Sequence, residues 1–348
     1  MSEIKHVAFL NPQGNFDQND SYWTEHPDFG GQLVYVKEVS LALAKMGIQV
    51  DIITRQINDP DWPEFSDLYD SYPGTDNLRI IRLPFGGDKF LAKEKLWPHL
   101  KEYVDAVAEF YDEEGAFPDF FTTHYGDGGM AGVLLKEKME CPFSFTGHSL
   151  GAQKMDKLNF SKDNFDQLID RFKFHSRIIA ERLTMKFSNQ IIVSTSQERM
   201  EQYSHPYYEG AVDVNNDDKF SVIPPGVNTD VFDGSYSKAT AEMIENYLER
   251  DLDADRIDKP TIICASRLDQ KKNHLALVEA FAGDQKLQQK SNLVITLRGI
   301  ENPFEDYSAA AGEEKEILDQ IMEVIEKNNL KGKVSMFPLG SQKELAEC

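Results

Sequence analysis

A histidine and a serine directly follow a predicted strand, in the segment Gly147-His148-Ser149-Leu150-Gly151. The preceding residues 142–146 are mostly aromatic or β-branched, which is typical of a strand. In open α/β sheets ligands bind beyond the carboxyl ends of the strands, so His148 and Ser149 are well placed to contact one. A purely structural hydrogen-bonding role is the alternative for His148. The spacing also fits a serine nucleophile, but no partners for it can be assigned.

A long loop, residues 11–29, ends in Gly30-Gly31-Gln32 just before a predicted helix. Loops of this length are more often functional than idle. Glycines let the backbone approach a ligand closely, and the free N–H groups of a helix start favour a phosphate. The alternative interpretation is a plain tight turn.

Basic residues are concentrated between residues 148 and 190. This stretch holds eight Lys or Arg against five Asp or Glu, an excess of three positive charges in a chain whose net charge is −22. We expect the excess to attract an anion. The alternative is a solvated helix face with ion pairs four residues apart, such as Arg177 with Glu181.

A second basic segment, Ser266-Arg267-Leu268-Asp269-Gln270-Lys271-Lys272-Asn273, follows the strand predicted at 261–265. It places cations at a strand end and a helix start. Such a position suits a diphosphate, because Arg can grip it with two donors and Lys can neutralise its charge. A basic surface loop is the alternative.

Short β-branched or aromatic runs alternate with amphipathic stretches along the chain. Strands are predicted at 6–10, 49–54, 78–83, 119–123, 142–146, 190–194, 219–223, 261–265, 293–297 and 334–337. Helices are predicted at 33–46, 99–111, 129–138, about 164–187, after Thr195, about 239–250, after Asn273 and near 313–327. This alternation predicts doubly wound parallel sheets with helices on both faces.

The run Ile223-Pro224-Pro225-Gly226-Val227-Asn228 cannot continue a helix or a strand, because two prolines remove backbone donors and a glycine follows. A length of 348 residues suits two domains, and we place them at 1–228 and 229–348. The second domain has three predicted strands, whereas doubly wound sheets usually have about five or six. We therefore expect it to be incomplete.

The charge of −22 repels both a polyphosphate backbone and an anionic lipid surface, so neither nucleic acid nor a membrane is an expected partner. No run reaches the roughly 18 apolar residues of a membrane span, and the first residues lack the pattern of a secretory signal. Cys141, Cys264 and Cys348 are widely separated, which disfavours a disulfide framework or a zinc site. A cytoplasmic protein is expected.

Seven segments, in order along the chain, resemble bacterial-type sucrose-phosphate synthases. They are Asn11-Pro12-Gln13-Gly14, Gly30-Gly31-Gln32, Lys93-Glu94 with Leu96-Trp97-Pro98, His124-Tyr125-Gly126-Asp127-Gly128-Gly129, Thr146-Gly147-His148-Ser149-Leu150-Gly151, Ile223-Pro224-Pro225-Gly226 and Ser266-Arg267-Leu268-Asp269-Gln270-Lys271-Lys272-Asn273. Single segments are partly shared with sucrose synthases, but the ordered set is typical of retaining glycosyltransferases. The resemblance implies an α/β fold of two facing Rossmann-like, doubly wound parallel-sheet domains (GT-B type), the second incomplete.

The resemblance also implies a reaction, in which UDP-glucose and fructose 6-phosphate give sucrose 6-phosphate and UDP with retention at the anomeric carbon. Residues that match the family's acceptor site are Gly30, Gln32, Lys93, Tyr125, Ser149, Lys154 and Arg177. Lys93, Lys154 and Arg177 would hold the phosphate, and the others would orient the sugar. Residues that match the donor site are Gly31, His148, Arg267 and Lys272, with His148 beside the donor glucose.

The catalytic residues implied by the resemblance are His148, Arg267 and Lys272. Arg267 and Lys272 would stabilise the charge of the departing diphosphate, which is electrostatic catalysis. No protein nucleophile or general base is assigned, because in the family the leaving phosphate itself helps to deprotonate the acceptor hydroxyl. No cofactor and no metal ligand is expected, and Mg²⁺ is compatible with this chemistry without being essential.

One departure from the family bears on activity. In the family a Glu-x7-Glu element later in the second domain holds the donor, and the sequence stops before such an element. We therefore expect a fragment that binds the acceptor yet transfers glucose slowly or not at all. The alternatives are a sister transferase, either a sucrose synthase or a mannosylfructose-phosphate synthase, and a non-catalytic sugar-phosphate-binding fragment. The cationic acceptor site disfavours a sucrose synthase, which uses free fructose.

Overall fold

The computed structural model describes residues 4–23, 26, 28–297 and 299–348. The chain divides into two compact units, Met1–Gly226 and Val227–Cys348, and the sequence analysis placed its boundary at 228/229. Among the described residues of the first unit, eight strands form one sheet in the order β3-β4-β2-β1-β5-β6-β7-β8. All neighbours pair in parallel except β3 and β4. The strands are β1 His6–Leu10, β2 Gln49–Arg55, β3 Tyr69–Asp70, β4 Leu78–Leu83, β5 Phe120–His124, β6 Phe143–Thr146, β7 Gln190–Val193 and β8 Phe220–Val222.

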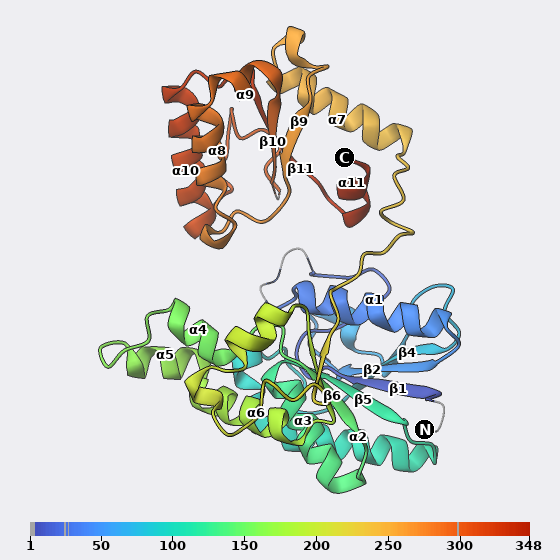
Figure 1. Cartoon of the computed structure of the whole chain (residues 1–348). Coiled ribbons are helices and arrows are strands. Elements are labelled where there is room, and N and C mark those ends of the chain that lie inside the picture. Colours follow the sequence, from blue (N-terminus) through green and yellow to red (C-terminus); the bar gives the residue numbers. More distant parts are fainter. Residues whose placement is uncertain (1–3, 24–25, 27, 298) are drawn as a thin grey trace. The chain divides into compact units, whose positions relative to one another are not determined.

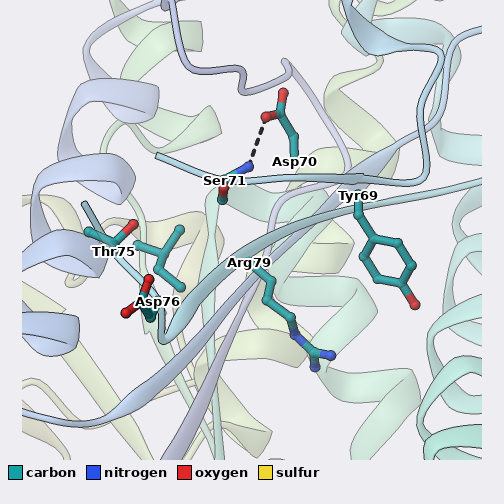
Figure 2. A pocket seen from close by; sticks show the side chains of 7 residues that line it. Tyr69, Asp70, Ser71, Thr75, Asp76 and Arg79 are labelled. Atoms are coloured by element: carbon teal, nitrogen blue, oxygen red, sulfur yellow. Dashed lines mark hydrogen bonds between the residues drawn. The ribbon is translucent and has the colours of Figure 1, made fainter. Parts of the chain in front are cut away.

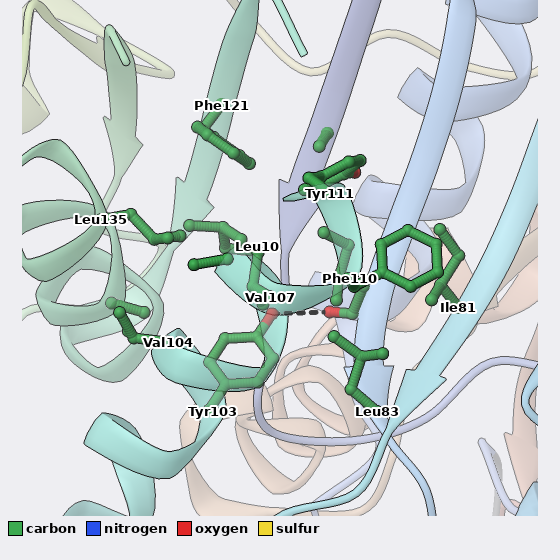
Figure 3. Close-up of a cluster of buried hydrophobic side chains, with 14 of the residues drawn as sticks. Leu10, Ile81, Leu83, Tyr103, Val104, Val107, Phe110, Tyr111, Phe121 and Leu135 are labelled. Atoms are coloured by element: carbon green, nitrogen blue, oxygen red, sulfur yellow. Dashed lines mark hydrogen bonds between the residues drawn. The ribbon is translucent and has the colours of Figure 1, made fainter. Parts of the chain in front are cut away.

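Helices cover both faces of this sheet, as the alternating sequence predicted (Figure 1). The helices are α1 Gly31–Lys45, α2 Leu100–Glu114, α3 Tyr125–Met139, α4 Gly151–Lys157, α5 Phe165–Phe172 and α6 Phe174–Phe187. Alternate residues of one strand enter different cores. Phe9 packs in the α1 core with Leu33, whereas Leu10 packs in the core of α2 and α3 with Tyr103 (Figure 3).

Two predicted helices take another form. The helix predicted at 164–187 is broken at Lys173, whose φ of +51° ends α5 before α6 begins. The break lets α6 begin on the buried Phe174, whereas no residue of α5 is buried. The helix predicted after Thr195 is a short π-helical turn, Glu198–Gln202. The remaining short helical turns of the first unit are Pro63–Phe65, Lys93–Lys95, Trp97–His99 and Pro206–Tyr208.

The second unit repeats the α/β pattern, with a parallel sheet whose described strands follow the order β11-β10-β9. The strands are β9 Thr261–Cys264, β10 Asn292–Leu297 and β11 Val334–Pro338. The helices are α7 Lys238–Asp251, α8 His274–Gly283, α9 Gln285–Lys290, α10 Gly312–Lys327 and α11 Gln342–Glu347, with short turns at Ala254–Arg256 and Gln270–Lys272. Its core joins β10 and β11 to α8 and α10.

Two buried arginines fix the loops at the carboxyl end of the first sheet. Arg55, which ends β2, donates to the carbonyl oxygens of Phe85, Gly87 and Lys89 at 2.8, 2.6 and 2.7 Å. Arg82, in β4, donates to the carbonyl oxygen of Phe16 at 2.6 Å and pairs with Asp70 at 2.6 Å. Because each hydrogen bond to a charged donor contributes about 1.5 to 3 kcal/mol, these loops are tied firmly to the sheet.

Asp51, in β2, is a buried carboxylate held by three side chains. Arg79 donates to it through Nε and Nη2 at 2.8 and 2.9 Å, and the Tyr111 hydroxyl donates at 2.9 Å. The Nε2 atom of His6 lies 2.7 Å from the same carboxylate. Burial alone would raise the pKa of Asp51, but the hydrogen bonds from His6 and Arg79 lower it to about 2.

Asp51→Asn is expected to destabilise the first unit by about 3 kcal/mol near pH 7, because a buried amide cannot replace the charged acceptor of Arg79 and leaves this half-buried guanidinium with Glu114 alone. In the native protein the pKa of Asp51 lies below the unfolded value of about 3.9, so its stabilisation is complete above about pH 4 and is lost as the pH falls towards 2. Trp23, Trp62 and Trp97 all lie in the first unit, so tryptophan fluorescence during urea unfolding isolates it.

The control for this variant is Asp112→Asn, on the exposed side of α2. It should leave the urea midpoint unchanged at every pH. If Asp51→Asn and the wild type lost stability equally between about pH 4 and pH 2, the carboxylate would not be the titrating group.

Candidate active site

The candidate site lies where the strand order of the first sheet reverses. β1 stands between β2 and β5. From β1 the chain first builds β2, β3 and β4 on one side, and then crosses to β5, β6, β7 and β8 on the other. Leu10 pairs with Thr123, and His124 pairs with Thr146, so β1, β5 and β6 end side by side. A reversal of this kind is where doubly wound sheets bind ligands.

His148 is turned back over these strand ends by a left-handed backbone, with φ +53°. Its Nε2 atom lies 2.9 Å from Nδ1 of His124, the last residue of β5. Its ring also contacts the rings of Tyr35 and Tyr125, at centroid distances of 5.1 and 5.3 Å. Burial lowers the pKa of His148 to about 4 and that of His124 well below its usual range. Both imidazoles are therefore neutral near pH 7, and the hydrogen bond between them joins two uncharged rings.

Gly30 and Gly31 form the start of α1, and both are exposed. A Cβ atom at either position would meet nothing within 4 Å, so this helix start is open to a ligand. Gln32 is buried, and its side-chain amide donates to Oδ1 of Asn11. Its Oε1 atom accepts from Nε2 of Gln13 at 3.4 Å. The glutamine thus ties the helix start to the loop that follows β1.

Arg177 makes the ion pair that the sequence analysis gave as the alternative to ligand binding. Its Nε atom donates to Glu181 at 2.9 Å, and its Nη2 atom donates to the carbonyl oxygen of Ser149. Its guanidinium lies 5.9 Å from the ring centre of Tyr125. Glu181 also accepts from the backbone N–H of Gly151. Arg177 is therefore held in one orientation, while its Nη1 group takes part in neither of these two hydrogen bonds.

The two predicted phosphate-binding lysines also have contacts within the chain. The Nζ atom of Lys93 lies 2.6 Å from Asp28, and Lys93 begins the turn between β4 and α2. The Nζ atom of Lys154, on α4, lies 3.8 Å from the ring centre of Phe172, which ends α5. A phosphate would thus have to compete with Asp28 for Lys93.

Asp127 belongs to this site, and the sequence analysis missed it. It lies in the first turn of α3 and is buried, and its Oδ2 atom has no hydrogen-bond partner among the described residues. Burial raises the pKa of Asp127 to about 6, although the backbone N–H groups and the charges of Arg177 and Lys93 act in the opposite direction. A buried carboxylate oxygen with no partner is costly, which is typical of a functional site.

The glycines around Asp127 explain how α3 comes so close to its neighbours. A Cβ atom on Gly128 would lie 2.9 Å from the carbonyl oxygen of Leu10, and one on Gly129 would lie 2.5 Å from Oγ1 of Thr184. Only glycine fits at these contacts with β1 and α6. The run of glycines in the sequence was therefore the available signal for a buried helix start at this position.

The second unit presents Arg267 and Lys272 in the loop after β9. The side chain of Arg267 is 58% exposed, with Nη2 3.9 Å from Asp269. Asp269 caps the turn Gln270–Lys272 by accepting from the backbone N–H of Lys272 at 3.2 Å. Both cations are thus exposed at the carboxyl end of a strand. They belong to a different unit from the other predicted site residues, and their binding of a diphosphate stays a prediction.

A separate hollow of about 620 Å³ lies at the amino end of β4, away from the candidate site (Figure 2). Tyr69, Asp70, Ser71, Thr75, Asp76, Leu78 and Arg79 line it. Arg79 is already engaged there by Asp51 and Glu114, so this hollow offers no free cation for a phosphate.

Within the described ranges, no group of three or more His, Cys, Asp or Glu is arranged to hold a metal ion. The same ranges contain no helix that is long and apolar enough to span a bilayer.

Comparison with known proteins identifies the family. A model of the first GT-B domain of sucrose synthase matches residues 1–247. A probable sucrose-phosphate synthase from Thermosipho melanesiensis is 47% identical over 343 residues, which cover 98% of this chain and 72% of that protein. The sucrose-phosphate synthase of Spinacia oleracea is 30% identical over 371 residues, covering 88% of this chain and 34% of its own length.

Solved structures show the fold. A sucrose-phosphate synthase from Thermosynechococcus elongatus superposes with a TM-score of 0.64 at 23% identity, over 99% of this chain and 72% of that one. The Anabaena protein HepE, solved with UDP-glucose, gives a TM-score of 0.53 at 13% identity, over 99% and 72% of the two chains. The protein is therefore a glycosyltransferase of the GT-B fold, which confirms the predicted fold class. The chain belongs to the sucrose-phosphate synthase family, as the seven segments predicted.

Proposed function

We propose that this protein transfers glucose from UDP-glucose to fructose 6-phosphate, with retention, and releases sucrose 6-phosphate and UDP. The observation that carries the proposal is the convergence of two cations on one strand-end site. Arg177 from α6 and Lys93 from the turn before α2 both act electrostatically on Tyr125 and Asp127. A phosphorylated acceptor supplies the anion that such a site favours.

In this proposal the first unit binds the acceptor. Lys93, Lys154 and Arg177 hold the phosphate, and Gly30, Gln32, Tyr125 and Ser149 orient the sugar. The partnerless Oδ2 atom of Asp127 accepts a hydrogen bond from a sugar hydroxyl, which would satisfy it.

The donor is assigned to Gly31, His148, Arg267 and Lys272. Arg267 and Lys272 neutralise the diphosphate as it leaves, and the leaving phosphate takes the proton of the attacking hydroxyl. Their charge makes a resident metal unnecessary for this step. We also place the protein in the cytoplasm, which its three cysteines without disulfide bonds support.

The test offers radiolabelled UDP-glucose together with either fructose 6-phosphate or fructose. Labelled sucrose 6-phosphate formed only from the phosphorylated acceptor supports the proposal. Product from free fructose would instead indicate a sucrose synthase, the enzyme for which the matching domain model is named. A labelled mannosyl donor in parallel tests for mannosylfructose phosphate. Binding of fructose 6-phosphate without any product would indicate a non-catalytic binding protein.

Lys154→Ala is expected to weaken fructose 6-phosphate binding by roughly 10- to 150-fold, because it removes a charged donor worth about 1.5 to 3 kcal/mol. Calorimetric titration with the sugar phosphate measures this loss. The matched control is Lys157→Ala, which removes an exposed lysine from the same helix and should bind as the wild type does. Equal affinities in Lys154→Ala and the wild type would remove Lys154 from the phosphate site.

A further inference from the structure

The strongest unassigned feature is the contact between His124 and His148 at the ends of β5 and β6. His124 is buried, stacked on Phe9 at 5.7 Å with ring planes 3° apart, and touched edge-on by Tyr35 at 5.8 Å. These rings leave His124 no room to turn. Its Nδ1 atom faces Nε2 of His148 at 2.9 Å, and its Nε2 atom lies 3.3 Å from Oγ1 of Thr122.

Only one of the two facing nitrogens can carry a hydrogen while both rings are neutral. If Nδ1 of His124 carries it, Nε2 of His148 is bare and accepts, so both rings are protonated at Nδ1. If Nε2 of His148 carries it, both rings are protonated at Nε2, and His124 then donates to Thr122. The second arrangement is favoured, because a neutral histidine side chain intrinsically prefers its proton on Nε2. Thr122 can accept in this arrangement, so the chain of hydrogen bonds is complete.

We propose that His124 is a positioning residue that holds His148 in the Nε2–H form, so that the bare Nδ1 atom of His148 accepts a hydrogen bond from a hydroxyl of the donor sugar. Among the described residues Nδ1 of His148 has no partner, whereas Nε2 is occupied by His124. The sugar hydroxyl assignment depends on the proposed function, while the proton position does not.

The orientation follows from backbone geometry as well as from the hydrogen bond. The left-handed conformation of His148 is strained for a residue with a side chain, and it directs the ring towards His124. Without an acceptor at position 124, the ring of His148 would lose the contact that fixes both its rotation and its proton. At metal sites, loss of the partner that orients a histidine typically costs about 10- to 100-fold, and we expect an effect of this order here.

Two variants of His124 separate the hydrogen bond from the packing. His124→Phe keeps an aromatic ring against Phe9 but removes the acceptor nitrogen. His124→Asn loses the ring but keeps a polar oxygen near the position of Nδ1. We expect the Phe variant to lower kcat by roughly tenfold or more with the KM for fructose 6-phosphate unchanged, and the Asn variant to recover most of that loss. His175→Phe, at an exposed position of α6, is the matched control and should behave as the wild type.

The decisive measurement is nitrogen NMR of the full chain with labelled histidine, because it reports the protonated ring atom directly. In the wild type and in His124→Asn, Nδ1 of His148 should give the shift of a bare nitrogen. In His124→Phe this signal should move towards a mixture of the two forms. A wild-type His148 protonated at Nδ1, or a signal unchanged in His124→Phe, would overturn the proposal.

A milder variant covers the case in which His124→Phe does not fold. Thr122→Val removes the oxygen next to Nε2 of His124 while keeping the shape of the strand residue. It should shift the same His148 signal in the same direction, by a smaller amount. If no transfer to any acceptor were detected, the proposed function would fail while the NMR result still decided the role of His124.

Discussion

Asp127→Asn is expected to make the first unit more stable near pH 7 and the protein a much poorer transferase. The native carboxylate is buried with one oxygen unpartnered, and its pKa is raised to about 6. An amide of the same shape removes the buried charge and can still accept from the backbone N–H groups at the start of α3. It cannot offer a charged acceptor to a sugar hydroxyl.

The sign of the stability change follows from proton linkage. Between about pH 4 and pH 6 the folded protein binds the Asp127 proton more tightly than the unfolded chain does, so wild-type stability falls as the pH rises through this window. Asp127→Asn should lack this fall, and its free energy of unfolding at pH 7 should exceed that of the wild type by about 2 to 3 kcal/mol. Urea unfolding followed by tryptophan fluorescence at pH 4 and pH 7 measures the difference. A variant less stable than the wild type at pH 7 would contradict the assignment.

The activity of the same variant should fall by roughly 10- to 150-fold, because a hydrogen bond to a charged group, worth about 1.5 to 3 kcal/mol, is lost in the bound state. Steady-state transfer to fructose 6-phosphate at pH 7 measures this loss. Asp112→Asn, introduced above, again serves as the control and should change neither quantity. Stability and activity moving in opposite directions would mark Asp127 as a functional group kept at the expense of the fold.

The second large effect is expected in the second unit. Arg267→Ala and Lys272→Ala should each lower kcat by about 100- to 1,000-fold, the range found when a group that stabilises developing negative charge is removed. Both side chains are exposed at the end of β9, so neither change should disturb the core of β10, α8 and α10. Lys271→Ala is the matched control, because it removes an exposed neighbouring cation without a proposed role.

UDP binding provides a second readout for these variants that does not require turnover. Calorimetry should show weaker UDP binding for Arg267→Ala and Lys272→Ala and unchanged binding for Lys271→Ala. Arg267→Lys should recover part of the affinity, because it keeps the charge but loses the two-pronged guanidinium. If Lys271→Ala were as impaired as the other two, a diffuse basic loop would explain the data better than a diphosphate site.

Most of the first sheet could be predicted from local sequence. The run 6–10 is apolar on both sides of the strand, as a central parallel strand must be, and it forms β1 with the predicted bounds. The break at Lys173 could not be predicted in this way. A glycine or asparagine at this position would have indicated a left-handed residue that ends a helix, but a lysine does not. The break depends instead on where Phe174 packs.

The positions of candidate site residues could be predicted where those residues directly follow a strand. They could not be predicted where they depend on packing between distant segments. His148 and Ser149 follow a strand, so their place at the sheet edge could be inferred. Asp127 has its raised pKa because α3 comes close to β1 and α6, a contact between distant parts of the sequence. The pairing of Lys93 with Asp28 likewise joins residues 65 positions apart, and no local pattern indicates it.

Arg55 and Arg82 donate hydrogen bonds to backbone carbonyl oxygens, and Arg82 also pairs with Asp70. The loops they hold, around Phe16 and at residues 85–89, therefore acquire their shape when the chain folds and not when a substrate arrives. The entropy of ordering these loops is lost before binding, so the proposed sugar phosphate would not have to offset it. A site ordered in advance gains affinity without any additional contact to its ligand.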